Sequence, residues 1–208
     1  MRRSATHFAL TALLLTATLL TPATARENEG LKVGDAIPAK NVKMKNIDGR
    51  ELSIADIAGK KGTVVIFSCN SCPWVQAWED RISSIGNAYW KKGFGVVAIN
   101  SNDPSRDQTD SFDAMKQRAK ERGFEFAYTV DATSDVARAF GATRTPEVFL
   151  FDQGGLLVYH GVIDDNAKSP DSVKEHYLRE ALEAMLAGKK IPVTETKALG
   201  CTIKFRPQ

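Results

Sequence analysis

The chain has 208 residues, with 28 Lys and Arg against 25 Asp and Glu, and it contains three cysteines. This near balance of charge provides no basic surface for nucleic acid or for anionic lipid, so we expect neither as a partner. The length suits one domain with a substantial hydrophobic core, and three thiols are too few for a disulfide scaffold.

The first 25 residues have the composition of an export signal. Arg2 and Arg3 precede an apolar stretch over residues 8–20, and Ala-Thr-Ala at residues 23–25 matches a cleavage site. Removal of this segment takes away two arginines and no acids, which leaves 26 basic against 25 acidic residues. We therefore expect a periplasmic or secreted protein, with a signal peptide over 1–25 and a single domain over 26–208. It would be held at a membrane only if the signal stays uncleaved.

Apolar periodicity and turn residues predict the elements that follow, in chain order. They are a β-hairpin over 42–53 that turns at Asp48-Gly49, a helical turn over 54–61, a buried strand over 63–67, a long helix after Pro73, a buried strand over 95–100, an amphipathic helix over 111–122, a strand over 124–130, a short helix over 134–140, a hairpin of 147–151 with 156–160, a polar loop over 163–171 and a helix over 173–186. Thr133 or Ser134 would cap the short helix, and Gly141 would end it. This order predicts an α/β fold, in which a central mixed sheet is flanked by helices and extended by the N-terminal hairpin.

Two cysteines stand where the first buried strand gives way to the long helix. Cys69 and Cys72 flank Asn70-Ser71, and Pro73 is at a position that the first turn of a helix tolerates. Unpaired NH groups and the positive end of a helix dipole stabilise a thiolate, so we expect the pKa of Cys69 to fall from about 8.5 toward neutrality. Cys69 would then attack a disulfide, and Cys72, one helical turn on, would resolve the mixed disulfide.

A zinc half-site and an inert disulfide are two other interpretations of this Cys-x-x-Cys pattern. Zinc would need two further ligands, and the chain offers only Cys201 and scattered histidines. His160 and His176 stand too isolated to propose as bases. We therefore expect no metal and no cofactor, and the position between strand and helix favours a reactive pair over an inert disulfide.

Several segments of the chain resemble a known family. They are Val33-Gly34-Asp35 with Ile37-Pro38, Cys69-Asn70-Ser71-Cys72-Pro73, Ala98-Ile99-Asn100-Ser101-Asn102-Asp103, Gly141-Ala142-Thr143-Arg144-Thr145-Pro146, Leu157-Val158-Tyr159 with Asp164-Asp165, and Gly200-Cys201-Thr202-Ile203-Lys204. Together they resemble peroxiredoxin-like, thioredoxin-fold proteins of the AhpC/TSA (redoxin) group. The resemblance implies a thioredoxin-like sheet and a cis Thr145–Pro146 bond beside the thiols, where the backbone of Thr145 pairs with an incoming disulfide substrate like an added strand. An ordinary turn is the other interpretation of Thr145-Pro146.

The family contains two chemistries, and this chain carries signs of both. Peroxiredoxins resemble Pro-x-x-x-Thr-x-x-Cys-Pro, which would place the peroxide-attacking thiol on Cys72. Val65 and Cys69 stand where that pattern has proline and threonine, so a second thiol replaces the hydroxyl that would orient a peroxide. Arg144 resembles the arginine that polarises the peroxide, and its other interpretation is a solvated loop arginine. The paired cysteines favour dithiol exchange over peroxide reduction.

Four further residues are candidates for auxiliary roles. Trp74 could form an apolar wall for a substrate or pack in the core. Cys201 could be a resolving thiol, a bridge to another chain or a buried spectator. Glu79 and Glu147 could carry the proton that Cys72 loses during exchange, and a surface carboxylate or a salt bridge is the alternative for each.

The sequence therefore predicts an exported thiol-disulfide oxidoreductase. Cys69 would attack, Cys72 would resolve, and Thr145 and Pro146 would position the partner strand. We expect protein or small-molecule disulfides as substrates, and a redox partner protein that recycles the dithiol. The alternatives are a peroxiredoxin-like thiol peroxidase with an antioxidant role, and a copper carrier that uses the two thiols as soft ligands.

Overall fold

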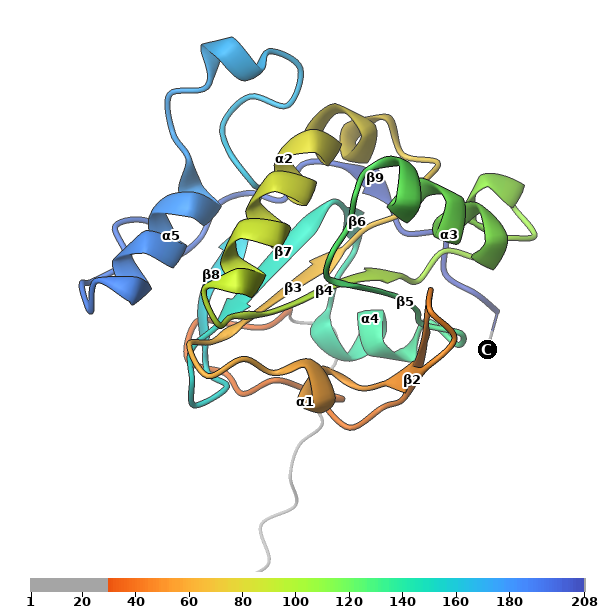
Figure 1. Cartoon of the computed structure of the whole chain (residues 1–208), viewed down its shortest axis with the longest axis horizontal. Coiled ribbons are helices and arrows are strands. Elements are labelled where there is room, and N and C mark those ends of the chain that lie inside the picture. Colours follow the sequence, from red (N-terminus) through yellow and green to blue (C-terminus); the bar gives the residue numbers. More distant parts are fainter. Residues whose placement is uncertain (1–29, 208) are drawn as a thin grey trace, which may run out of the picture.

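The computed structural model describes residues 30–207 (Figure 1). The predicted signal peptide over 1–25 lies outside these residues. The strands are β1 (Met44–Asn46), β2 (Glu51–Leu52), β3 (Thr63–Phe67), β4 (Gly95–Asn100), β5 (Ala127–Val130), β6 (Arg144–Thr145), β7 (Glu147–Phe151), β8 (Leu157–Gly161) and β9 (Cys201–Thr202). The helices are α1 (Ile54–Ile57), α2 (Pro73–Lys91), α3 (Phe112–Glu121), α4 (Asp135–Phe140) and α5 (Tyr177–Leu186), with 3₁₀ turns η1 (Gln108–Asp110) and η2 (Pro170–Ser172). Across residues 30–207, no helix is long and apolar enough to cross a membrane.

Seven strands form one mixed sheet in the order β2-β1-β5-β4-β3-β7-β8. The strands β3, β4 and β5 run parallel, whereas β7, β8 and the β1–β2 hairpin are added antiparallel. The N-terminal hairpin turns at Gly49, whose φ of 89° lies in the left-handed region that glycine adopts readily. The predicted mixed sheet and its N-terminal hairpin are therefore confirmed.

Helices cover both faces of the sheet, so the central strand is buried on both sides. In β3, Val64 and Ile66 belong to the core cluster that includes residues of α2, α3 and α5. Val65 and Phe67 belong to the second cluster, which includes residues of α1 and α4. Side chains alternate between the two faces of a strand, and this explains why an uninterrupted apolar run is needed here.

The structure corrects three local predictions. The last helix begins at Tyr177 rather than at 173, because two hydrogen bonds hold residues 174 and 175 in a loop: the NH of Lys174 donates to the Asp165 carboxylate, and the NH of Asp165 donates to the carbonyl oxygen of Glu175. Ser134 does not cap α4 through its side chain, since its hydroxyl donates to the carbonyl oxygen of Ser101 at 2.7 Å. The loop over 163–171 is not wholly polar, because Ile163 is buried in the core.

The segment after α5 returns to the carboxyl-terminal edge of the central strands. The NH of Thr196 donates to the carbonyl oxygen of His160 at 2.9 Å, which fixes the segment along β8. It then reaches β9, which pairs antiparallel with β6 (Figure 1). The register of this pair sets Cys201 opposite Thr145, so the third cysteine lies against the residue that precedes Pro146.

Candidate active site

The loop between β3 and α2 carries the Cys-x-x-Cys pair. The strand ends at Phe67, Cys72 is the N-cap of α2, and Pro73 is its first residue. Both Cys69 and Cys72 are free thiols, and each is only 2% exposed. The predicted position between a buried strand and a helix N-terminus is confirmed, and the sulfurs are shielded there.

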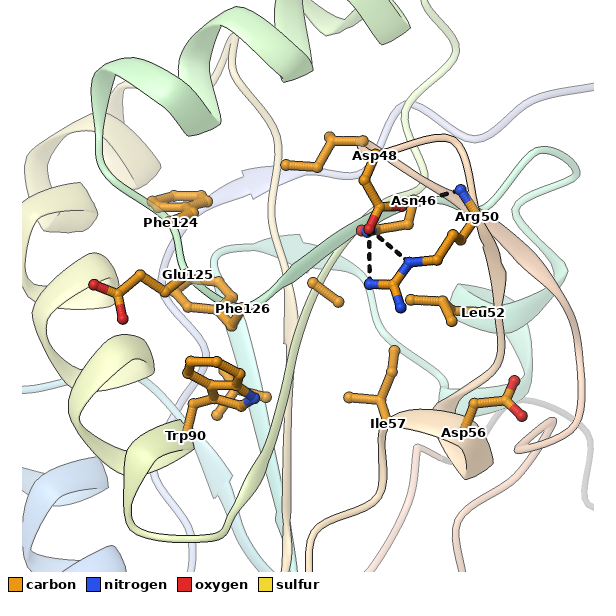
Figure 2. A pocket seen from close by; sticks show the side chains of 13 residues that line it. Asn46, Asp48, Arg50, Leu52, Asp56, Ile57, Trp90, Phe124, Glu125 and Phe126 are labelled. Atoms are coloured by element: carbon orange, nitrogen blue, oxygen red, sulfur yellow. Dashed lines mark hydrogen bonds and ion pairs between the residues drawn. The ribbon is translucent and has the colours of Figure 1, made fainter.

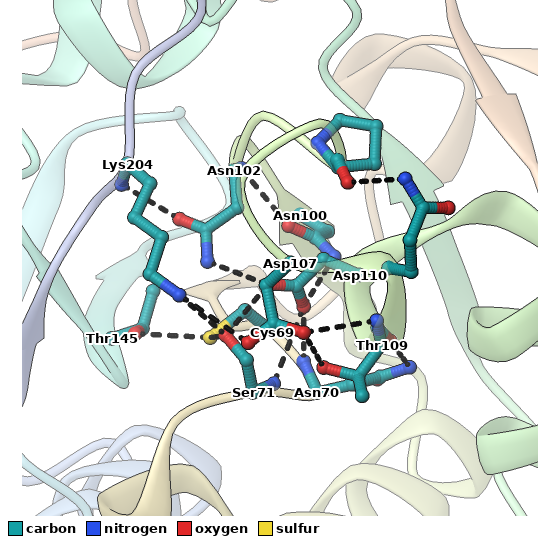
Figure 3. Close-up of polar contacts among 12 residues, drawn as sticks. Cys69, Asn70, Ser71, Asn100, Asn102, Asp107, Thr109, Asp110, Thr145 and Lys204 are labelled. Carbon is teal, nitrogen blue, oxygen red and sulfur yellow. Dashed lines mark hydrogen bonds and ion pairs between the residues drawn. The ribbon is translucent and has the colours of Figure 1, made fainter.

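The peptide bond between Thr145 and Pro146 is cis and lies beside both thiols. The Thr145 hydroxyl oxygen is 3.3 Å from the Cys69 sulfur, as Figure 3 shows, and the Thr145 carbonyl oxygen is 3.0 Å from the Cys72 sulfur. The arrangement that the family resemblance implied is therefore present. The same residue, Thr145, touches both sulfurs and presents its backbone to β9.

A buried carboxylate holds the loop between the two cysteines. Asp110, in η1, accepts hydrogen bonds from the NH of Asn70 at 2.7 Å and from the hydroxyl of Ser71 at 2.7 Å (Figure 3). The side-chain amides of Asn100 and Asn102 donate to the same carboxylate at 3.2 and 2.9 Å. Sequence reasoning missed Asp110, because no local pattern shows that residue 110 lies beside residue 70.

A lysine from the C-terminal segment closes the other side of the loop. The ammonium group of Lys204 donates to the Ser71 hydroxyl at 3.3 Å and lies 3.6 Å from a carboxylate oxygen of Asp107. Its backbone NH donates to the Asn102 side chain at 2.8 Å. The segment that follows β9 is thus bound to the dithiol loop through the side chain of Lys204 and to Asn102 through its backbone (Figure 3).

Hydrogen bonding favours the thiolate of Cys72. The Cys69 thiol is the strongest contributor, and the Cys201 thiol and the NH groups of Val75 and Cys201 add to it, so that the pKa of Cys72 falls to about 4 in spite of burial. A protonated Cys72 would instead donate to the Thr145 carbonyl oxygen, a single contact that favours the thiol form. The larger set of donors stabilises the charged form.

The pKa of Cys69 moves in the opposite direction. Its hydrogen bond to Cys72 raises it, and burial and the negative charge of Asp110 raise it further. The prediction of a lowered pKa for Cys69 is therefore wrong for the reduced protein. The reason is that the hydrogen bond between the two thiols favours the thiolate on Cys72, which is also the N-cap of α2. The two thiols titrate as a pair that loses its first proton from Cys72.

The two predicted proton carriers are both held in ionic contacts. Glu79 is 3% exposed and pairs with Arg118 and Arg122 at 2.7 and 2.8 Å, which agrees with the salt-bridge interpretation. Glu147 is buried and accepts from the NH groups of residues 143 and 144 at 2.9 Å. Its other oxygen is 2.8 Å from His160, so that histidine is not isolated as the sequence suggested. Both carboxylates therefore have structural partners, and Glu147 positions the residues that lead into β6.

Trp74 and Arg144 both have partners in the structure. Trp74 is partly buried and packs against Trp78 with ring centroids 6.1 Å apart, which agrees with the packing interpretation. Arg144 is exposed, and its guanidinium donates to the carbonyl oxygen of Gly200 at 3.3 Å and to the Thr202 hydroxyl at 3.4 Å. Arg144 therefore contacts the C-terminal segment, and the thiols are enclosed by neighbouring side chains.

Cys201 is the one cysteine of the three that is partly exposed. It packs against the core cluster that contains Cys69 and Cys72. Burial, the hydrogen bond to Cys72 and the negative charge of Cys72 together raise the pKa of Cys201 to about 11. The NH of Trp74 and the positive charge of Lys204 act in the opposite direction. Over residues 30–207, no group of three or more His, Cys, Asp or Glu side chains is arranged to hold a metal ion.

A separate pocket of about 470 Å³ lies between the N-terminal hairpin, β5 and the end of α2 (Figure 2). Trp90 and Phe124 form one side, and the ion pair of Asp48 with Arg50 at 2.7 Å forms the other. None of the predicted site residues lines it. The candidate site is therefore the buried thiol cluster and not this pocket.

Comparison with models of protein families matches residues 32–178 to the family described as Redoxin. The chain belongs to the Redoxin family. This redoxin is also similar to the thiol-disulfide oxidoreductase ResA of Bacillus thuringiensis subsp. konkukian (strain 97-27). The two are 22% identical over 132 residues, which cover 64% of this chain and 70% of ResA.

Solved structures also resemble the redoxin. An uncharacterized conserved protein from Geobacillus kaustophilus is 35% identical, with a TM-score of 0.79, and the match covers 85% of this chain and 94% of that one. A thioredoxin-like protein in the oxidized form is 18% identical, with a TM-score of 0.60, over 76% of this chain and 99% of that one. The second likeness confirms the thioredoxin-like fold that the sequence predicted.

Proposed function

We propose that this redoxin is a thiol-disulfide oxidoreductase that exchanges its Cys69/Cys72 dithiol with substrate disulfides. The observation that carries the proposal is the pair of free thiols at the N-terminus of α2, one of which has a pKa of about 4, beside the cis Thr145–Pro146 bond. The similarity to a protein named thiol-disulfide oxidoreductase ResA supports the same reaction.

Cys72 is the attacking sulfur in this proposal, since it holds the thiolate in the reduced protein. Its thiolate attacks one sulfur of a substrate disulfide, forms a mixed disulfide and releases the other substrate sulfur as a thiolate. Cys69 then gives up its proton and attacks the Cys72 sulfur. The second substrate thiolate leaves, the Cys69–Cys72 disulfide forms, and the two released thiolates take up one proton from Cys69 and one from solvent.

The edge of β6 is the proposed place for a protein substrate. Thr145 touches both sulfurs through its side chain and its carbonyl oxygen, so a strand that pairs with β6 brings its own disulfide close to them. Because each sulfur is only 2% exposed, exchange requires the segment that now pairs with β6 to move aside. A redox partner protein would recycle the dithiol.

We also propose that the protein works outside the cytoplasm, as a single domain over 26–208 released from a signal peptide over 1–25. The supporting observation is the sequence pattern of two arginines, an apolar stretch and a cleavage site. N-terminal sequencing of the protein from a periplasmic fraction tests this, and a first residue of Met1 in mature protein would contradict it.

Insulin reduction by the full chain, with and without substitutions, tests the exchange reaction. Cys72→Ser should abolish it, and Cys69→Ser/Cys201→Ser, which lacks both thiols that could resolve the adduct, should trap a mixed disulfide on Cys72, visible by mass spectrometry. Ser84→Ala, at an exposed position of α2, is the matched control and should behave as the wild type. Trapping in Cys72→Ser instead would reverse the assignment of roles, and full activity of Cys72→Ser and of the double variant would overturn the proposal.

A further inference from the structure

The C-terminal segment over residues 199–205, called the covering segment below, is fitted closely to the thiol site. Ile203 is 3% exposed and donates its NH to the carbonyl oxygen of Thr143 at 2.9 Å. The carbonyl oxygen of Lys204 accepts from the NH of Asp103 at 2.7 Å. At Gly200, a Cβ atom would lie 2.1 Å from the Thr145 carbonyl oxygen. The segment is therefore a packed part of the fold that leaves no room for a side chain next to the cis bond.

The covering segment occupies the edge at which a substrate strand would pair. β9 is antiparallel to β6, and its register sets Cys201 opposite Thr145. An extended polypeptide that binds to the edge of a sheet adds backbone hydrogen bonds in this manner. The chain thus presents its own cysteine in the place where a substrate would present a disulfide sulfur.

Cys72 lies near both of the other cysteines. The Thr145 carbonyl oxygen is 3.0 Å from the Cys72 sulfur, and Cys201 stands opposite Thr145 in the β6–β9 pair. Hydrogen bonding from the Cys69 and Cys201 thiols and from the NH of Cys201 lowers the pKa of Cys72. The NH of Trp74, in the first turn of α2, acts on the Cys201 sulfur. Either neighbour can therefore attack a disulfide that Cys72 has formed.

The three thiols differ in their access to solvent. Cys69 and Cys72 are each 2% exposed, whereas Cys201 is partly exposed at the rim of the site. We propose that Cys201 is a third redox-active thiol. It exchanges with the buried Cys69–Cys72 disulfide to form a Cys72–Cys201 disulfide, whose Cys201 sulfur a partner's thiol can reach from the surface. This inference deepens the proposed function and rests on it.

The exchange step needs no external oxidant. The Cys201 thiolate attacks the Cys72 sulfur of the Cys69–Cys72 disulfide, a Cys72–Cys201 bond forms, and the Cys69–Cys72 bond breaks. Cys69 leaves as a thiolate and takes up the proton that Cys201 has lost. A thiolate of the partner protein then attacks the Cys201 sulfur, which forms a mixed disulfide and releases Cys72 as a thiolate. A second thiol of the partner displaces Cys201 from that mixed disulfide, so the partner leaves with a disulfide and Cys201 takes up the proton of the second thiol.

Oxidation of Cys72 would itself activate Cys201. In the reduced protein, burial, the hydrogen bond to Cys72 and the negative charge of Cys72 all raise the pKa of Cys201. Burial remains once Cys72 is in a disulfide, but the hydrogen bond and the charge disappear, so the pKa of Cys201 falls. The NH of Trp74 and the charge of Lys204 still favour the thiolate. Cys201 is therefore a weak nucleophile in the reduced protein and a better one in the oxidised protein.

Disulfide mapping of the full chain tests the proposal. Cys69→Ser protein is oxidised with glutathione disulfide, blocked with an alkylating reagent, digested without reductant and examined by mass spectrometry. More than half of the molecules should contain a Cys72–Cys201 disulfide, and the matched Cys69→Ser/Cys201→Ser variant should retain a glutathione adduct on Cys72. A Cys69→Ser protein that carries only the glutathione adduct overturns the proposal.

A second measurement uses the wild-type protein, so its result does not depend on whether a variant folds. At equilibrium with a glutathione redox buffer, its peptide map should contain both the Cys69–Cys72 and the Cys72–Cys201 disulfides. A map with Cys69–Cys72 alone, with insulin reduction intact, rejects the role of Cys201 and leaves the proposed function standing. A map with neither disulfide under strong oxidation rejects the proposed function as well.

Discussion

Replacing Gly200 with alanine should uncover the thiol site. The added Cβ would lie 2.1 Å from the Thr145 carbonyl oxygen and 3.1 Å from the Pro146 nitrogen, both of which are backbone atoms that cannot swing aside. Ordinary contact begins at 3.4 Å, so the covering segment must shift by about 1.3 Å. A shift of this size breaks the backbone bond from Ile203 to Thr143 and the contact of Arg144 with residue 200.

The expected magnitude follows from these two contacts. Each is worth about 1 kcal/mol net, so detachment of the covering segment becomes easier by about 2 kcal/mol. An equilibrium changes tenfold for about every 1.4 kcal/mol, so the detached form should be populated about 30 times more. The seven-stranded sheet does not depend on this segment, and global unfolding should be less affected than this local opening.

The assay is the rate at which iodoacetamide alkylates Cys72 in the reduced full chain, followed by mass spectrometry. We expect the rate in Gly200→Ala to rise by about 30-fold, in proportion to the population of the opened form. Gly30→Ala is the matched control, because its added Cβ would meet only the carbonyl oxygen of Gly141 at 3.8 Å. Equal rates in Gly200→Ala and the wild type would refute the reasoning that this segment covers the dithiol.

Three further predictions concern the electrostatics and the anchors of the site. Absorbance of the reduced protein at 240 nm should show one thiolate that forms with a midpoint near pH 4, because a lowered pKa keeps the Cys72 thiolate above that pH and loses it below. Cys69→Ala should raise this midpoint, and a single transition at an ordinary thiol pKa would contradict the assignment. Asp110→Asn should lower the free energy of unfolding by about 3 kcal/mol, since two or more buried hydrogen bonds are lost. The control Asp113→Asn, at an exposed position, should leave that free energy unchanged, and denaturant titration measures both variants. Glu147→Ala should slow insulin reduction several-fold by loosening β6, and an unchanged rate would show that its bonds to residues 143 and 144 are dispensable.

The sequence predicted the elements that are defined by local patterns. The buried strand over 63–67 was identifiable from its uninterrupted apolar run, and the hairpin at Gly49 from its turn residues. The placement of the two thiols at the end of β3 followed from the same local signals. The cis Thr145–Pro146 bond came from the family resemblance and not from the residues alone.

The contacts that set the chemistry of the site join residues far apart in the chain. Asp110 holds the loop at residue 70, and Cys201 lies against Thr145. No period or turn signal encodes such pairings, because they depend on how the sheet brings separate loops to one edge. The order of the two thiol pKa values was missed for a related reason. It is set mainly by the hydrogen bond between the two thiols, and Cys201, far away in the sequence, also lowers the pKa of Cys72.

The pairing of β6 with β9 has a consequence for biosynthesis. The ribosome makes Cys69 and Cys72 long before it makes the strand that shelters them, so the nascent protein passes through a stage in which both sulfurs are open to oxidants and to foreign thiols. The time during which both sulfurs stay open would therefore depend on how quickly Cys201–Thr202 pairs with Arg144–Thr145.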